Sequence, residues 1–151
     1  MAIPQYRIFF DNSVYVAALL SHQGAARELL RLVEAGAIRM VVSEEVIIEA
    51  DRVIGAKFPE LIQEGRKLWK HLGPDTATNP TTEQMKPFVR KLHKGDAAIL
   101  AAAHLAKVSA FVTWNTRHFM RPGVASLVDF PIVVPAGALK LFMQWLEPFL
   151  E

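Results

Sequence analysis

A short apolar segment that ends in a carboxylate places the strongest constraint on how this chain folds. Residues Tyr6–Phe10 form a mostly apolar run, and Asp11-Asn12-Ser13 follows it directly. Such a run suits a strand in the middle of a sheet that is covered on both faces. In open α/β sheets, ligands bind beyond the carboxyl ends of the strands. The sequence therefore predicts that Asp11 lies at a ligand-binding edge, provided that later segments bring matching groups there.

Strand and helix patterns alternate along the rest of the chain. The predicted strands are Tyr6–Phe10, Arg39–Val42, Asp75–Asn79, Ala110–Thr113 and Pro131–Val134. The predicted helices are Ser13–Leu20, Gly24–Ala35, Ser43–Ile54, Phe58–Leu72, Thr81–Leu92, Asp96–Lys107 and Ala136–Leu150. Strands that alternate with helices pair in parallel. This order predicts an α/β fold, a three-layer α/β/α sandwich around a mostly parallel central sheet.

Composition limits the class of protein. A chain of 151 residues that is 52% hydrophobic and 21% charged is expected to form one folded domain over residues 1–151. It has no cysteine, which excludes disulfides, thiolate catalysis and Cys-based zinc sites. No apolar run is long enough to cross a bilayer, and the N-terminus lacks a signal-peptide pattern, so we expect a cytoplasmic protein without membrane association. The net charge of +2 permits a polyanionic partner without requiring one.

Acidic and amide side chains follow each of the first four predicted strands. Asp11 leaves the first strand, Glu49 lies on the helix after the second, and Asp96 opens the helix after the third. Thr113 and Asn115 follow the fourth. Because parallel strands end at one edge, these groups should converge there. Clustered carboxylates repel one another unless a cation joins them. Oxygen ligands without Cys or paired His suit Mg²⁺ or Mn²⁺.

Each of these residues also has a purely structural interpretation. Asp11 and Asp96 suit helix N-caps, because their carboxylates can accept from free backbone N–H groups. The pair Glu44-Glu45 suits solvated acids in the first turn of a helix. Glu49 could lie on a solvated helix face, and Asn115 suits a turn. Sequence position alone leaves these alternatives open for every residue taken singly.

Four ordered segments together resemble a known family. They are Phe9-Phe10-Asp11-Asn12-Ser13, Val42-Ser43-x5-Glu49-x2-Arg52-Val53, Gly95-Asp96-x2-Ile99-Leu100-Ala101-x-Ala103 and Val112-Thr113-Trp114-Asn115-x2-His118-Phe119. In this order they resemble the motifs of PIN-domain nucleases, and the resemblance covers nearly the whole chain. The family consists of metal-dependent endoribonucleases, most often VapC-like toxins of bacterial and archaeal toxin–antitoxin pairs.

The resemblance implies roles for particular residues. Asp11, Glu49 and Asp96 match the carboxylates that hold a catalytic Mg²⁺ or Mn²⁺ in the family. Ser13 and Thr113 match small hydroxyl positions that help to hold metal, water or phosphate. The fourth motif usually offers a further aspartate where this chain has Asn115. That departure removes one negative charge and should weaken a second metal site more than the first, although an amide can still ligate or orient a water.

The resemblance also implies partners: an RNA substrate, a possible cognate antitoxin and a homodimer. Arg117 flanks the fourth motif and could contact an RNA phosphate, as could Lys94, His118 and Arg121, while solvated surface charge explains each of them equally well. The wide apolar stripe of the final helix is more typical of core, and a part left exposed would suit a dimer partner or an antitoxin segment.

Two other functions remain open at this point. The first is an aspartate-based phosphohydrolase or receiver domain with Asp11 as the phosphorylated group. Such a hydrolase would place a second aspartate where this chain has Ser13. The second is a non-catalytic module that keeps the fold and binds RNA or protein, an interpretation that Asn115 favours. The sequence does not indicate an RNA target, because phosphate contacts carry no base information.

Overall fold

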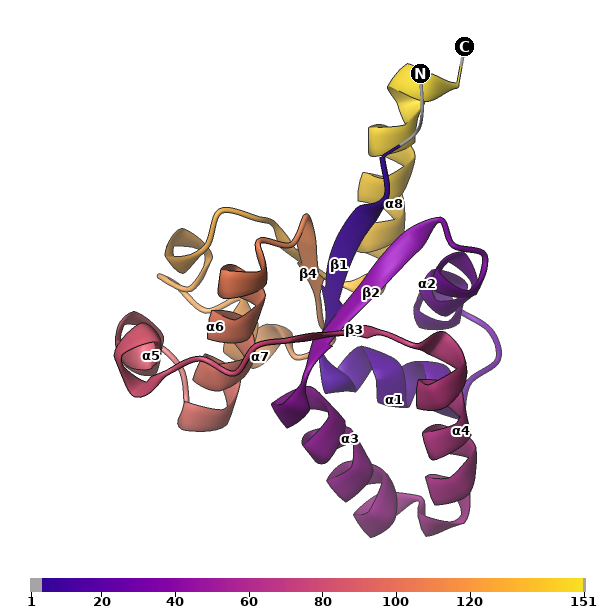
Figure 1. The fold of residues 1–151 in the computed structure, drawn as a ribbon, viewed down its shortest axis with the longest axis horizontal. Helices are drawn as coiled ribbons and strands as arrows, with labels where there is room; N and C mark the ends of the chain where they lie inside the picture. The colour runs from indigo at the N-terminus through magenta and orange to yellow at the C-terminus, as the bar shows by residue number, and fades with distance from the viewer. Residues whose placement is uncertain (1–3, 151) are drawn as a thin grey trace.

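A five-stranded parallel sheet forms the centre of the molecule, seen in a computed structural model that describes residues 4–150 (Figure 1). The strands are β1 (Tyr6–Phe10), β2 (Ile38–Ser43), β3 (Asp75–Ala77), β4 (Ala110–Val112) and β5 (Ile132–Val133). They lie in the order β3-β2-β1-β4-β5, and every neighbouring pair is parallel. The predicted α/β class and parallel sheet are therefore confirmed, and the first strand of the chain is the central one.

Helices cover both faces of the sheet. They are α1 (Asn12–Leu20), α2 (Ala25–Glu34), α3 (Glu44–Lys57), α4 (Ile62–Leu72), α5 (Thr82–Val89), α6 (Lys94–Ala106), α7 (Thr116–Phe119) and α8 (Pro135–Leu146). The connections from β1 to β2 and from β2 to β3 step one way across the sheet, and the connection from β3 to β4 steps back. Because such crossovers are right-handed, α1–α4 lie over one face and α5–α6 over the other. The predicted three-layer sandwich is confirmed.

The centre of the sheet carries the most deeply buried side chains. Ile8, Phe9 and Phe10 of β1 and Phe111 of β4 are fully buried, and the rings of Phe9 and Phe111 stack with centroids 5.4 Å apart. The register pairs Phe10 with Val112, so both strands end at the same level. Asp11 and the residue after Val112 therefore leave the sheet side by side.

Prolines account for two differences from the predicted helices. The pattern over Phe58–Leu72 is broken at its start into a 3-10 turn, Pro59–Leu61, before α4 begins. The helix predicted to reach Leu92 ends at Val89, and Pro87 lies within its last turn. Proline has no backbone N–H to donate, which weakens the turn in which it sits.

The remaining differences lie at the ends of elements. Helix α6 begins at Lys94, so His93 is its N-cap and the N-cap interpretation of Asp96 is wrong. Helix α8 starts at Pro135, at the position where proline suits a helix, and a 3-10 turn, Glu147–Phe149, follows it. A short helix, α7, occupies residues that had no predicted structure. A further 3-10 turn spans Ala125–Leu127.

Helix α1 is tied to α4 by an aromatic contact. The rings of Tyr15 and Trp69 stack at an interplanar angle of 9°, and the Tyr15 hydroxyl donates to the Gly65 carbonyl. Gly65 permits close packing, since a Cβ there would lie 3.3 Å from Cδ2 of Leu19. Helix α1, which begins beside Asp11, is thereby anchored to α4. Among residues 4–150, no helix has the length and apolar character needed to cross a membrane.

Candidate active site

Asp11 sits in a buried cradle of hydroxyl groups where β1 ends. It occupies the N-cap position of α1, but its side chain makes no capping hydrogen bond. Instead, its Oδ2 accepts from the hydroxyls of Ser13 and Thr113, each at 2.8 Å. Asp11 is 2% exposed, and Thr113 is fully buried. The geometry therefore favours a role for this carboxylate beyond helix capping.

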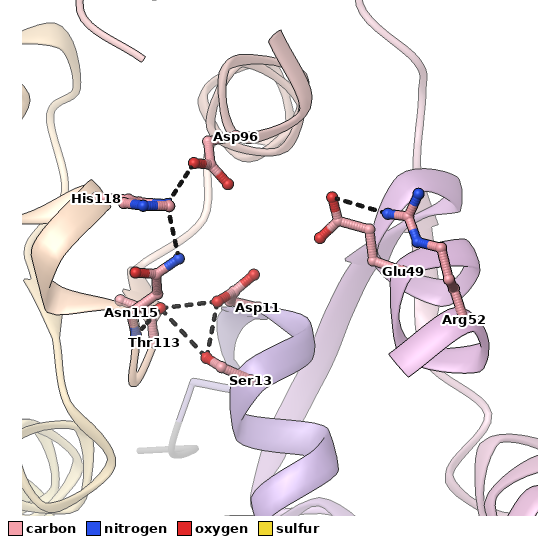
Figure 2. Close-up of polar contacts among 8 residues, drawn as sticks. All are labelled: Asp11, Ser13, Glu49, Arg52, Asp96, Thr113, Asn115 and His118. Carbon is pink, nitrogen blue, oxygen red and sulfur yellow. Dashed lines mark hydrogen bonds and ion pairs between the residues drawn. The ribbon is translucent and has the colours of Figure 1, made fainter. Parts of the chain in front are cut away.

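The backbone of the fourth motif orients the two hydroxyls. The Trp114 N–H donates to Ser13 Oγ, and the Asn115 N–H donates to Thr113 Oγ1, both at 2.9 Å. Each hydroxyl thus accepts from a backbone N–H and gives its own proton to Asp11. Segments about 100 residues apart in sequence share this network. Because both donors meet Oδ2, the other oxygen of Asp11 points away from the cradle, toward the space that Figure 2 shows in front of it.

Glu49 and Asp96 face that same space (Figure 2). Glu49 projects from α3, with a side chain 18% exposed, and Asp96 projects from the first turn of α6, with a side chain 14% exposed. Gly95 makes room for this approach, because a Cβ on it would lie only 3.2 Å from Oε1 of Glu49. The prediction that the acids of the first three motifs meet at one sheet edge is consistent with this arrangement.

The carboxylates influence one another electrostatically. Burial is the main cause that raises the pKa of Asp11 above its ordinary value, and the charge of Asp96 adds to it. Burial also raises the pKa of Glu49, followed by the charges of Asp11, Glu45 and Asp96, while Arg52 opposes the shift. Burial and the neighbouring charges together make Asp11 and Glu49 harder to ionise, a cost that a cation beside them would relieve.

Two basic side chains hold the outer acids. His118 Nδ1 lies 2.8 Å from Oδ2 of Asp96 and 3.0 Å from the amide nitrogen of Asn115. Arg52 lies 3.7 Å from Oε1 of Glu49. The sequence placed His118 among groups flanking the motif and missed its contact with Asp96. The spacing of three residues was a signal only for its contact with Asn115, since residues three apart share a face once α7 exists.

Asn115 and Arg117 belong to α7 and its cap. Asn115 is the N-cap residue of this helix, but its side chain turns to His118 and makes no capping bond. Arg117 is exposed on the helix, and within residues 4–150 no hydrogen bond or ion pair engages its guanidinium. The position of Arg117 is compatible with a contact to phosphate, and its role stays a prediction.

The acids are of the chemical type that binds a hard divalent cation, but they are not close enough together to surround one. Across the described residues, no three His, Asp or Glu side chains approach closely enough to form a complete ligand group. The donors facing the space are nevertheless all carboxylate oxygens, the ligands that Mg²⁺ and Mn²⁺ prefer. Burial, with a smaller contribution from neighbouring acids, raises the pKa of Asp11 and of Glu49, so a cation beside them would favour their ionised forms. Asp11, Glu49 and Asp96 would be the residues that hold such an ion.

The fold is a parallel α/β sandwich, and several acids lie near the carboxyl edge of its sheet. Comparison with known proteins identifies the family of this α/β domain. Residues 7–117 match the family model described as PIN domain. Because this match covers more than half of the chain, the protein belongs to the PIN-domain family, whose members are generally nucleases.

Solved structures share the fold. One is a chain of VapBC2 from Rickettsia felis, crystallised bound to a DNA fragment from the promoter, with a TM-score of 0.61 and 14% identity over 85% of this chain and 98% of that chain. Another is PAE2754 from Pyrobaculum aerophilum, with a TM-score of 0.56 and 14% identity over 95% of this chain and 98% of that chain. At such identity the likeness concerns the fold alone. A comparison with curated proteins finds no significant match.

Proposed function

We propose that the protein is a metal-dependent endoribonuclease that cleaves single-stranded RNA. The observation that supports this most is the placement of Asp11: a buried carboxylate, oriented by two hydroxyls, with Glu49 and Asp96 facing it across a shared space. A cluster of acids at the carboxyl edge of a parallel sheet suits a cation and a phosphodiester together.

Each residue has a distinct task in this proposal. Asp11, Glu49 and Asp96 hold Mg²⁺ or Mn²⁺, an ion that neutralises phosphodiester charge and makes a bound water more acidic. Ser13 and Thr113 fix the carboxylate plane of Asp11 through their hydrogen bonds. The remaining two predicted residues, Asn115 and Arg117, act on the substrate.

Asn115 and Arg117 complete the proposed site. The amide of Asn115 orients a water or the scissile phosphate at the neutral end of the site, where the charge of an aspartate is missing. Arg117, exposed on α7, contacts an RNA phosphate. Contacts of this kind make binding dependent on salt rather than on base sequence.

The test compares RNA cleavage with and without metal. A mixed RNA pool is incubated with Mg²⁺, with Mn²⁺ and with EDTA, using the parent protein, Asp11→Asn and Asp96→Asn. We expect EDTA and either substitution to reduce cleavage by at least about 100-fold, the loss typical of removing one charge-stabilising group. Asp129→Asn, which alters an exposed acid outside the four motifs, is the matched control. Equal cleavage in every sample would contradict the metal–carboxylate mechanism.

We also propose that the protein is the toxin of a type II toxin–antitoxin pair and acts in the cytoplasm. The support is similarity of fold to a chain of VapBC2 together with membership of the PIN-domain family. Induced expression should arrest growth, Asp11→Asn should not, and co-expression of a small protein encoded beside the gene should restore growth. Growth that continues during expression of the active parent protein would contradict this role.

A homodimer is the assembly we propose, with the apolar side of α8 at its interface. Met143 on this helix is 58% exposed, and Leu150 just beyond it is 63% exposed. Exposed apolar groups of this kind often mark contact surfaces. Light scattering should give twice the chain mass, and Met143→Lys should shift it toward the monomer.

A second candidate is a non-catalytic PIN-like module that binds RNA or protein. Asn115 favours it, as do the contacts that Arg52 and His118 already make with Glu49 and Asp96. Calorimetry separates the two: absence of Mg²⁺ and Mn²⁺ binding at millimolar metal, with RNA binding retained, would support the module. An aspartate-based phosphohydrolase is the less supported alternative, and acid-labile phosphorylation of Asp11 would be its signature.

A further inference from the structure

A surface cavity of about 150 Å³ lies beside the acidic site, between the start of α3, the segment before α5 and the side of α6. Its lining includes Glu44, Ile48, Asn79, Pro80, Met85 and Ala98. Ile48, Pro80 and Met85 are apolar and larger than a methyl group, and they form the walls. Glu44 and Asn79 are polar and provide hydrogen-bonding groups at one end. This combination is typical of a pocket for a small, flat, partly polar group.

Glu45 connects the cavity to the neighbourhood of the proposed catalytic site. It also lines the cavity. The Oε1 atoms of Glu45 and Glu49 approach the same glycine, since a Cβ on Gly95 would lie 3.8 Å from the first and 3.2 Å from the second. Glu49 in turn faces Asp11 and Asp96 (Figure 2). A nucleotide whose phosphate meets those acids could therefore place its base in the cavity.

The polar end of the cavity presents acceptors. Asn79 Nδ2 donates to Oε2 of Glu44 at 3.1 Å. This bond engages one amide proton and one carboxylate oxygen, and it leaves Asn79 Oδ1 and the other oxygen of Glu44 to accept from a ligand. A phosphate would be repelled by Glu44 and Glu45. A neutral ring that carries N–H donors on one edge fits this end of the cavity.

The apolar walls fit the faces of such a ring. Ile48 is 49% exposed although it is large and apolar, and it stands at the cavity beside Pro80 and Met85. Proteins that recognise single-stranded RNA commonly cover the face of an unstacked base and hydrogen-bond its Watson–Crick edge. Exposure of Ile48 at the cavity is consistent with a contact of that kind.

We propose that this cavity is a base-recognition subsite for the nucleotide next to the cleaved phosphodiester, and that Glu44 and Asn79 select guanine there. Guanine carries two adjacent donors, N1–H and the N2 amino group, which match the acceptors of Glu44 and Asn79. Inosine lacks the amino group, and uracil has one N–H between two carbonyls. The inference rests on the proposed ribonuclease function, to which it adds a sequence preference.

Cleavage of defined oligonucleotides tests the selection. Single-stranded RNAs that differ at one position, guanosine or inosine, are cleaved by the parent protein, Glu44→Gln and Asn79→Ala. The parent should favour guanosine by at least about fivefold, the lower end of discrimination by a paired hydrogen-bond contact. Both substitutions should bring the guanosine-to-inosine ratio close to one. Glu60→Gln, which alters an exposed acid in the 3-10 turn before α4, should keep the parent ratio. A parent ratio near one, or an unchanged ratio in both variants, overturns the subsite.

Nucleotide titration separates failure of the subsite from failure of the enzyme. If no RNA is cleaved under any metal condition, GMP, IMP and UMP are titrated into the full chain while the methyl resonances of Ile48 and Met85 are followed. Shifts with GMP that exceed those with IMP and UMP, and that Glu44→Gln abolishes, support the subsite even though the proposed nuclease function fails. No shift with GMP overturns it. Shifts with an arginine-rich peptide alone also overturn it, in favour of a protein partner.

Discussion

The inner and outer halves of the acidic site are held in different ways. Asp11 is almost completely buried, and two hydroxyls from segments about 100 residues apart fix one of its oxygens. Glu49 and Asp96 are partly exposed, and each meets a basic side chain, Arg52 or His118. The inner acid is thus oriented without a ligand, while the outer acids would have to release Arg52 and His118 to hold the proposed cation. Preorganisation is concentrated at the strand exit.

The largest effect that tests this comparison should come from Thr113→Val. The change keeps the shape of the side chain but removes one donor to Asp11 and the acceptor of the Asn115 N–H. Asp11 keeps its bond from Ser13, but the part-buried Asn115 N–H is left without an acceptor, and such a loss costs about 1–3 kcal/mol. We expect the free energy of unfolding, measured by urea titration, to fall by about that amount, and RNA cleavage to fall with it.

Thr76→Val on the edge strand β3 is the matched control, because Thr76 is exposed. Its free energy of unfolding should stay within about 0.5 kcal/mol of the parent. If both threonine variants lose stability equally, the inner half is no more preorganised than the sheet edge.

The pH dependence of stability should be the next largest effect. The folded-state pKa values of Asp11 and Glu49 are raised above their ordinary values of 3.8 and 4.5. An acid whose pKa is raised by folding binds its proton more tightly in the folded state than in the unfolded state. Its ionised form therefore destabilises the folded protein above the folded-state pKa. That penalty disappears as the pH falls toward the ordinary pKa. In EDTA, the melting temperature should therefore rise as the pH is lowered from 7 toward that range.

Metal and Asp11→Asn should each reduce this pH effect. The substitution removes the buried charge and should raise the melting temperature at pH 7, by about 2–4 °C per kcal/mol recovered. A divalent cation at a free concentration about 100 times its dissociation constant should stabilise the protein by about 2.7 kcal/mol. A pH profile that is the same for the parent and Asp11→Asn would show that the inner acid carries no such penalty.

A smaller change is expected from Asn115→Asp, which extends the acidic character of the site toward His118. The added charge should strengthen Mn²⁺ binding several-fold in calorimetry, because opposite charges in a partly buried site attract. It should also lower the melting temperature in EDTA, since one more acid joins the cluster. Unchanged affinity for Mn²⁺ would mean that position 115 does not face the bound ion.

The smallest effect should come from Arg52→Gln at the rim of the outer half. The guanidinium lies 3.7 Å from Glu49, and its side chain is 69% exposed. Exposed ion pairs contribute about 0–1 kcal/mol, so thermal unfolding should change very little. A loss comparable to that of Thr113→Val would erase the distinction between the two halves.

The sequence could predict the parts of the fold and site that follow from apolar runs and from parallel pairing. Ile8–Phe10 and Phe111 are apolar enough to mark the central strands, and they are fully buried. Once β1 and β4 pair in parallel with Phe10 beside Val112, Asp11 and Thr113 must leave the sheet together. Their meeting is a consequence of register, which is why four short motifs were enough to predict it.

The parts that could not be predicted depend on single turns and on packing between distant segments. Helix α7 has one turn, too few residues for a periodic pattern, so the contact from His118 to Asp96 was hidden. Helix α6 begins two residues before Asp96, and this start could not be predicted because its N-cap, His93, is a residue type with little capping preference. The bond between Asn79 and Glu44 joins positions 35 residues apart and depends on how the loop before α5 folds back.

The central place of β1 has a consequence for the newly made protein. The cradle of Asp11 needs Thr113, and the strand that carries it toward Asp11 is the fourth of five in the chain. A nascent polypeptide, made at about 5–20 residues per second, therefore lacks the inner half of the site until about three quarters of it has left the ribosome. A ribosome-bound fragment that ends before β4 should therefore lack the proposed nuclease activity.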